Sequence, residues 1–252
     1  MKHLKIFLLL FITAPLWLTA QKAMPKKVLM VGNSFTYFWN MPQMVNAMAA
    51  EDGYPMEVHQ STIGGATWEE HYNEKRGSQT RLLLKSKPWD YVILQDHSLS
   101  TIEAPGRFDE YGKKLAGAVV KAGAKPYLMM TWAYLSNPLM QDVISNKYNA
   151  LAHELNTEAI PVGDIFMKAR KLRPDLNFYF DDKHPSSIGS YLIGLIMYKA
   201  LTGNSVKDVP DRLLSKDQRG EQVILSFIHH ETGVFLRQLV EETEFTTKLI
   251  QE

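Results

Sequence analysis

The strongest constraint on the fold is a short apolar run at residues 27–32, which ends at Gly32 and is followed by Ser34. An apolar run of this length, closed by a turn signal, is typical of a strand that is buried on both faces of a parallel sheet. Ligands of parallel α/β sheets bind beyond the carboxyl ends of the strands. The pattern therefore places Ser34 where a nucleophile would stand, although Gly-Asn-Ser is also an ordinary turn sequence.

Strand-like and helix-like patterns alternate along the rest of the chain. Predicted strands occupy residues 27–32, 56–60, 91–95, 126–131 and 159–162, and helical periods occupy residues 41–51, 68–71, 108–122, 142–155 and 187–203. No linker rich in Pro, Gly or Ser separates them. We therefore predict one three-layer α/β domain, an α/β/α sandwich around a mainly parallel five-stranded sheet. Residues from 216 onward are predicted to be helical or irregular and carry no motif.

Residues 1–20 have the pattern of a cleaved secretory signal. Lys2 and Lys5 precede an apolar run at residues 6–18, and small residues follow it up to Ala20. The run is too short to span a bilayer, so we expect no membrane anchor after cleavage. The sequence predicts a secreted or periplasmic protein whose single catalytic domain covers residues 21–252.

Composition excludes several classes of function. The chain has no cysteine, which excludes disulfides, thiolate metal sites, a thiol nucleophile and a thioether lipid anchor. It has 28 basic and 27 acidic residues, and loss of Lys2 and Lys5 with the signal leaves 26 against 27. A chain so near neutrality has no electrostatic footprint for nucleic acid or anionic membranes.

A second motif lies far downstream, where Asp181 precedes His184 by three residues and Pro185 follows. A serine hydroxyl is a weak nucleophile until a base removes its proton, and that base must be held in one tautomer by an acid. An acid at this spacing can reach back to the ring N–H of the histidine. Acidic residues beside Lys and His also occur in plain solvated loops, which is the alternative for this motif alone. The other histidines, including His229 and His230, have no partner at metal-ligand spacing, so we predict no metal site.

A third motif is the glycine turn at residues 61–67, between a predicted strand and a predicted helix. Gly64 and Gly65 allow backbone N–H groups to face a ligand there. A tight turn without chemistry is the alternative.

Together these motifs resemble those of the SGNH hydrolase superfamily, the GDSL-type esterases and lipases, over residues 27 to about 203. The family's Gly-Asp-Ser appears with Asn33 in place of Asp, Gly65 matches the oxyanion glycine, and residues 181–185 match Asp-x-x-His-Pro. The resemblance implies a flavodoxin-like α/β/α fold. It also implies that Ser34 attacks an ester carbonyl, His184 is the base and Asp181 orients it. An acyl-serine intermediate follows, and no cofactor is needed.

The family's remaining motif, Gly-x-Asn-Asp after the third strand, is absent. The chain has Gln95, Asp96, His97 and Ser98 instead. We predict that the Gln95 amide joins the backbone N–H groups of Ser34 and Gly65 in the oxyanion hole, because an amide donates without changing protonation state. Counting along the loop favours His97 or Ser98 instead.

Several aromatic residues follow predicted strands, where a sugar ring could stack on them: Trp39, Trp68, Trp132 and Tyr134. Burial in the core is the alternative for each. We expect a secreted esterase that removes O-acyl groups, most simply O-acetyl groups, from carbohydrate, so the expected partner is a small-molecule or glycan ester. The alternatives are a lipase or short-chain aliphatic esterase, and a catalytically inactive carbohydrate-binding relative.

Overall fold

The computed structural model describes residues 24 and 26–244. The predicted signal peptide lies outside the described residues. Within the described part, no helix is both long and apolar enough to cross a membrane.

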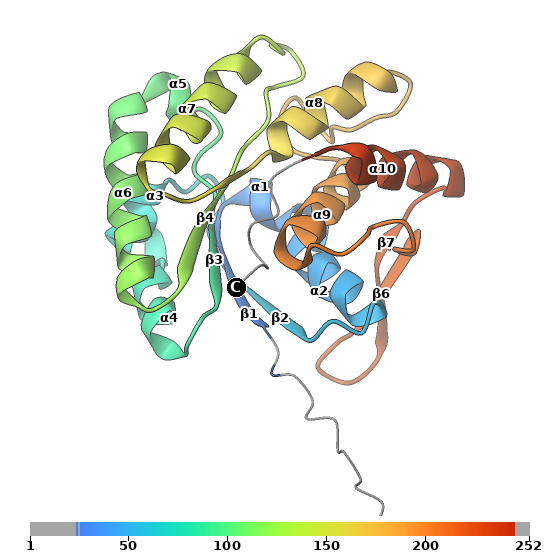
Figure 1. Cartoon of the computed structure of the whole chain (residues 1–252), viewed down its shortest axis with the longest axis horizontal. Coiled ribbons are helices and arrows are strands. Elements are labelled where there is room, and N and C mark those ends of the chain that lie inside the picture. Colours follow the sequence, from blue (N-terminus) through green and yellow to red (C-terminus); the bar gives the residue numbers. More distant parts are fainter. Residues whose placement is uncertain (1–23, 25, 245–252) are drawn as a thin grey trace, which may run out of the picture.

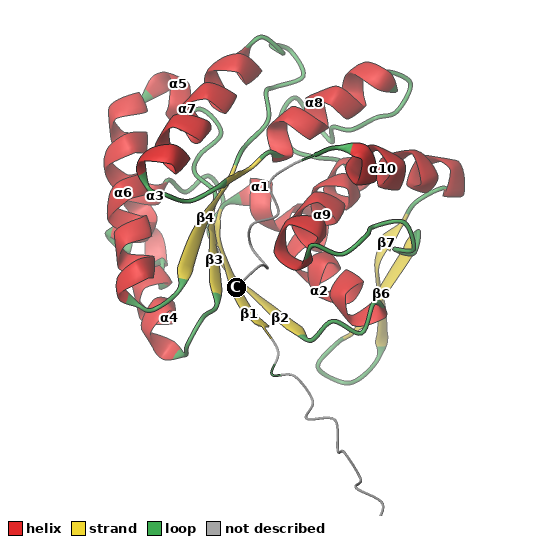
Figure 2. Ribbon diagram, in the orientation of Figure 1, coloured by secondary structure: helices red, strands yellow, loops and turns green. Residues whose placement is uncertain are grey.

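The centre of the molecule is a five-stranded sheet in which all neighbouring strands are parallel (Figure 2). The strands, in the spatial order of the sheet, are β2 (Met56–Thr62), β1 (Lys26–Gly32), β3 (Tyr91–Leu94), β4 (Lys125–Met129) and β5 (Ala159–Ile160). This confirms the predicted α/β class and the five strands.

Helices cover both faces of the sheet (Figure 1). One face packs against α2 (Met41–Glu51), α8 (Val162–Leu172) and α9 (Ser187–Thr202), and α10 (His230–Glu242) packs on α8 and α9. The other packs against α3 (Trp68–Tyr72), α4 (Thr80–Ser86), α6 (Pro105–Lys121) and α7 (Met140–Glu154). Val28 and Met30 of β1 enter the first core, whereas Leu29 and Val31 enter the second. Because both faces are buried, the strand reads as a continuous apolar run.

Two parts of the fold differ from the prediction. The strand predicted at residues 159–162 ends at Ile160, and α8 begins at Val162. The C-terminal part contains an antiparallel hairpin, β6 (Arg212–Lys216) and β7 (Gln222–Phe227), ahead of α10. The sequence hid this hairpin because the first residues of β7 are exposed in succession, which leaves no alternation to detect. The remaining short elements are α1 (Ser34–Tyr37), η1 (Phe38–Asn40), η2 (Lys75–Gly77) and α5 (Ser100–Glu103).

The strand order creates a switch point between β1 and β3. The helix that follows β1, α2, lies on one face, and the long helix that follows β3, α6, lies on the other. Loops after the two strands therefore diverge and leave a place for a ligand at their carboxyl ends. Ser34 follows β1 at this point, and the loop that begins with Gln95 follows β3.

Candidate active site

The turn after β1 is closely packed against the side chains of Thr36 and Gln95. A β-carbon at Gly32 would overlap the Thr36 hydroxyl and lie 2.5 Å from the Gln95 carbonyl oxygen, so only glycine fits. Asn33 caps the short helix α1, because its Oδ1 accepts the N–H of Phe35 at 3.0 Å. Ser34, the first residue of α1, is thereby fixed at the switch point.

Asn33 also ties three loops together. Its Nδ2 donates to the carbonyl oxygen of Ala66 at 2.9 Å and lies 3.4 Å from that of Asp96. These partners are acceptors, and an aspartate carboxylate cannot donate to them. The local hydrogen bonds thus account for Asn at a position where the family motif has Asp.

The structure brings the serine and the downstream Asp-x-x-His motif together. Ser34 Oγ lies 2.9 Å from His184 Nε2, and His184 Nδ1 lies 2.7 Å from Asp181 Oδ2. Backbone N–H groups of Lys183 and His184 donate to the other Asp181 oxygen at 2.8 and 2.7 Å. The acid, the ring and the hydroxyl form one continuous hydrogen-bonded line, the arrangement in which an imidazole can take a proton from serine.

Asp181 is held as a carboxylate. Burial raises its pKa, but the hydrogen bonds from the His184 ring and from the two backbone N–H groups outweigh burial and lower the pKa to about 2. Asp182 points elsewhere, because its carboxylate accepts the backbone N–H and the hydroxyl of Ser136, both at 2.8 Å. The two neighbouring acids thus have different partners.

The glycine turn after β2 lies beside the serine turn. Ile63 N–H donates to the carbonyl oxygen of Gly32 at 3.2 Å, and Gly65 has a φ of +68°, which favours glycine. A capping box between Thr67 and Glu70 then starts α3. The predicted backbone donors, Ser34 and Gly65, therefore lie on adjacent turns at the carboxyl ends of paired strands.

The prediction that Gln95 donates to the oxyanion is wrong. Its Oε1 accepts the Asn33 N–H at 3.0 Å and the Thr36 hydroxyl at 2.9 Å, and its Nε2 donates to the carbonyl oxygen of Asp96. The side chain is fully buried beneath Gly32. Gln95 is part of the support of the nucleophile turn, because strand alternation turns it into the protein.

Ser98 and His97, the alternatives to Gln95 as oxyanion donor, have different partners. Ser98 Oγ lies 2.8 Å from the Tyr134 hydroxyl, which joins the loops after β3 and β4. His97 is half-buried, and its Nδ1 accepts the N–H of Leu99 at 3.4 Å. That contact places the ring proton of neutral His97 on Nε2.

The prediction that Trp68 and Trp132 bind substrate is wrong. Trp68 and Trp132 are fully buried in the two cores. Trp132 stacks between Phe35 and Phe166, with centroid distances of 4.2 and 5.0 Å, and its indole N–H donates to the carbonyl oxygen of Lys183 at 2.9 Å. It packs beneath the histidine loop, so it cannot meet a substrate. Tyr134 is half-buried on the loop after β4, and its contact with substrate stays a prediction.

Sequence analysis missed several residues that surround the triad. Phe38 stacks on the His184 ring with centroids 4.3 Å apart and an interplanar angle of 9°, and Phe180 lies 6.0 Å from Phe38. Phe38 follows Ser34 by four residues and Phe180 directly precedes Asp181, so their nearness to the motifs in sequence could have indicated them. His71 is a further support, because its Nε2 donates to the carbonyl oxygen of Gly32 at 2.9 Å while Thr80 Oγ1 lies 2.7 Å from Nδ1. Burial lowers the pKa of His71 and keeps it neutral for this role.

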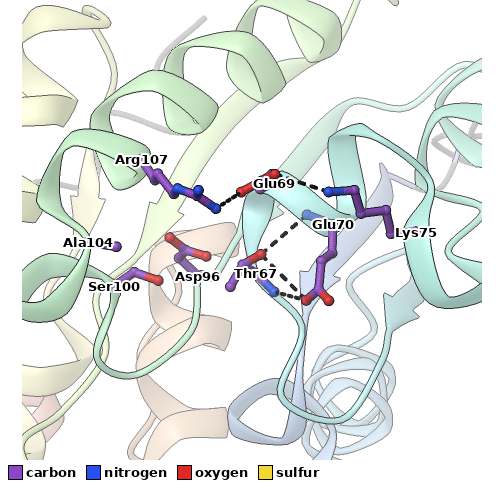
Figure 3. Close-up of a pocket in the computed structure, with 8 residues that line it drawn as sticks. All are labelled: Thr67, Glu69, Glu70, Lys75, Asp96, Ser100, Ala104 and Arg107. Atoms are coloured by element: carbon purple, nitrogen blue, oxygen red, sulfur yellow. Dashed lines mark hydrogen bonds and ion pairs between the residues drawn. The ribbon is translucent and has the colours of Figure 1, made fainter.

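A cavity of about 340 Å³ adjoins the glycine turn from the other side (Figure 3). Its lining includes Thr67, Glu69, Asp96 and Arg107, but neither Ser34 nor His184. Arg107 and Lys75 pair with Glu69 across it (Figure 3). Across the described residues, 24 and 26–244, no cluster of His, Cys, Asp and Glu is arranged to hold a metal ion.

Similarity to known proteins is found among solved structures. No family model and no curated protein matches the chain. Among solved structures, a candidate SGNH hydrolase from Slackia heliotrinireducens is 26% identical, with a TM-score of 0.61 over 69% of this chain and 98% of that one. A DUF4886 family protein from Bacteroides uniformis is 19% identical, with a TM-score of 0.67 over 86% and 93%. An acetyl xylan esterase, AlAXEase, is also 19% identical, with a TM-score of 0.59 over 69% and 99%.

The fold, the order of the motifs and these structural neighbours agree. Together they support the SGNH hydrolase superfamily as the class of this chain. The likeness to the solved structures supports a hydrolase of the esterase type at the level of the family.

Proposed function

We propose that this protein is a serine esterase that removes O-acetyl groups from carbohydrate through Ser34, His184 and Asp181. The observation that carries the proposal is the hydrogen-bonded line from Ser34 Oγ through the His184 ring to Asp181, at 2.9 and 2.7 Å. Ser34 and His184 lie 150 residues apart in the chain. A structural role for either residue does not require this alignment.

The reaction follows the usual two steps of a serine esterase. His184 Nε2 takes the proton of Ser34 as the hydroxyl attacks the ester carbonyl, and Asp181 stabilises the imidazolium. Backbone N–H groups of Ser34 and Gly65 donate to the oxyanion. His184 then protonates the leaving alcohol and activates the water that releases the acid from Ser34.

The choice of substrate rests on two supports. An acetyl xylan esterase is among the proteins with the same fold, and Phe38, which stacks on His184, is followed outward by the exposed rings of Phe180 and Trp39. Lipid or short aliphatic esters are the alternative substrates. We also propose that residues 1–20 direct export, which suits a polymeric substrate outside the cell.

The first test is the loss of the nucleophile. Ser34→Ala is expected to lower kcat for 4-nitrophenyl acetate by about three orders of magnitude or more, as triad removal does in other serine hydrolases. A fluorophosphonate probe should label the wild-type protein but not this variant. Absence of both hydrolysis and labelling in the folded wild type would instead favour the inactive carbohydrate-binding relative.

The neighbouring residues Asp181 and Asp182 provide a matched test of the acid of the triad. Asp181→Asn is expected to lower kcat by about three to four orders of magnitude, because the amide no longer favours the productive tautomer and the imidazolium. Asp182→Asn alters only the contact with Ser136 and should change kcat by no more than a few fold. The reverse order would assign the role to Asp182.

A further inference from the structure

Three aromatic side chains gather on one side of the His184 ring. Phe38 stacks on the imidazole, with centroids 4.3 Å apart. Phe180 lies 6.0 Å from Phe38 and 6.5 Å from Trp39, tilted by 59° and 72°. We call Phe38, Trp39 and Phe180 the aromatic corner.

The outer members of the corner are held in place although they face solvent. Trp39 is 44% exposed and Phe180 is 65% exposed. The indole N–H of Trp39 donates to the carbonyl oxygen of Pro185 at 3.0 Å, and the backbone N–H of Phe180 donates to that of His184 at 2.8 Å. The first contact fixes the Trp39 ring, and the second fixes the backbone of Phe180, to the loop that carries the base.

The backbone at Trp39 adds a second observation. Trp39 and Asn40 both have positive φ values, 52° and 55°, a region that bulky side chains rarely occupy. Strained backbone of this kind is typical of functional sites, where surrounding contacts maintain it. Here the indole next to the strained backbone stays 44% exposed and is held by the carbonyl oxygen of Pro185, the residue after His184.

The position of the corner identifies which half of an ester it would meet. The oxyanion donors, Ser34 and Gly65, lie at the ends of β1 and β2, so the carbonyl oxygen points there. The alcohol oxygen must instead approach His184 Nε2, because that nitrogen supplies the proton for the leaving group. A group attached to this oxygen lies on the His184 side of the site, where the aromatic corner is.

The chemistry of the rings favours a sugar. The C–H groups on one face of a pyranose carry partial positive charge and pack against the electron-rich face of an aromatic ring. Rings that stay half exposed leave the sugar hydroxyls in water, whereas an alkyl chain gains from complete enclosure. The corner itself carries no charge, which suits a neutral ring.

We propose that Phe38, Trp39 and Phe180 form the subsite for the pyranose ring that carries the acetyl ester. This rests on the proposed esterase activity and adds the residues that select its alcohol half. Phe38 also packs on His184, so Trp39 and Phe180 are the positions at which selectivity is tested.

The experiment compares kcat/KM for O-acetylated xylotriose with kcat/KM for ethyl acetate, which has the same acyl group and no sugar. Phe180→Ala and Trp39→Ala are each expected to lower the ratio of the two values by about tenfold or more, mainly through KM. Phe180→Tyr keeps the ring and should restore the ratio. Leu82→Ala, which removes an exposed apolar side chain from α4, is the matched control and should leave it unchanged.

An unchanged ratio in both alanine variants overturns the proposal. Hexyl acetate is a third substrate, and a selective loss of its hydrolysis with the sugar ester unaffected also overturns the proposal. The latter result would assign the corner to an alkyl alcohol. Failure of the esterase proposal itself looks different, because wild-type protein and Ser34→Ala would then be indistinguishable on ethyl acetate.

Discussion

At the scale of single residues, the nucleophile turn depends on one buried amide. Gln95 Oε1 accepts from both the backbone of Asn33 and the hydroxyl of Thr36. Gln95→Ala leaves these two buried donors without a partner and opens a cavity under Gly32. We expect the free energy of unfolding to fall by about 2–5 kcal/mol, measured by urea denaturation.

The result separates two roles for Gln95. Leu82→Ala is the control for loss of an exposed side chain and should change stability little. If Gln95→Ala instead kept the stability of the wild type and lost kcat alone, Gln95 would be the oxyanion donor after all.

The sequence predicted which residues gather, but not how each side chain is turned. Ser34, His184 and Asp181 follow from motifs whose spacing is local, so their positions relative to strand ends could be foreseen. The orientation of Gln95 depends on strand alternation beyond Leu94, and the burial of Trp132 depends on Phe35 and other distant partners. Contacts of that kind arise only when the sheet is assembled.

At the scale of elements, the start of α3 is joined to the loop after β3 by Asp96. Its carboxylate accepts the N–H of Trp68 at 2.7 Å at the N-terminus of the helix. Burial raises the pKa of Asp96 to about 6, against hydrogen bonds from Trp68, His97 and Ser100 that lower it. The folded protein therefore binds this proton more tightly than the unfolded chain does.

The sign of the resulting pH effect follows directly. Between about pH 4 and about pH 6 the native state holds more protons than the unfolded state, so the Asp96 contribution to stability decreases as pH rises through that window. Asp96→Asn keeps an acceptor for Trp68 and removes the titration. We expect the stability of the variant relative to wild type to increase by on the order of 1–3 kcal/mol from about pH 4.5 to about pH 7.5.

Urea denaturation of both proteins at the two pH values measures this difference. Asp96 is 2% exposed, so solvent screening does not erase the effect. Parallel stability curves for the two proteins would mean that Asp96 titrates normally and that its burial is relieved by water.

Among the elements, those with a clear period were predictable and those without were not. The central strands are continuous apolar runs because both faces are buried. The hairpin of β6 and β7 has exposed Val223 and Ile224 side by side, so neither a strand nor a helix period is visible. α10 does have a period, with buried Leu236, Leu239 and Val240, and it agrees with the helical alternative predicted for the residues from 216 onward.

At the scale of the whole molecule, polar contacts join the C-terminal hairpin and α10 to α9. The Arg237 guanidinium pairs with Asp211 and lies 3.2 Å from the Tyr191 hydroxyl, and Asp211 also contacts His230 at 2.7 Å. Burial raises the pKa of Asp211, but the hydrogen bonds from Arg237 and His230 outweigh burial and lower it. Lys199 of α9 adds a second clamp by donating to the last carbonyl groups of α10 at 3.1 and 2.8 Å.

Removal of this anchor tests whether the chain is one cooperative domain. Arg237→Ala leaves the Asp211 carboxylate without its buried cation, and we expect the free energy of unfolding to fall by about 2–4 kcal/mol. Arg212→Ala, at an exposed arginine next to Asp211, is the matched control and should change stability by less than about 0.5 kcal/mol. Because the triad comes from other elements, kcat of the Arg237 variant should stay near that of the wild type.

A single urea transition seen by both tryptophan fluorescence and circular dichroism would support one domain over the described residues, since the fully buried Trp132 reports the central core and α10 adds to the helical signal. Two separated transitions would show that the hairpin and α10 form an independent unit, and the single-domain prediction would then be wrong.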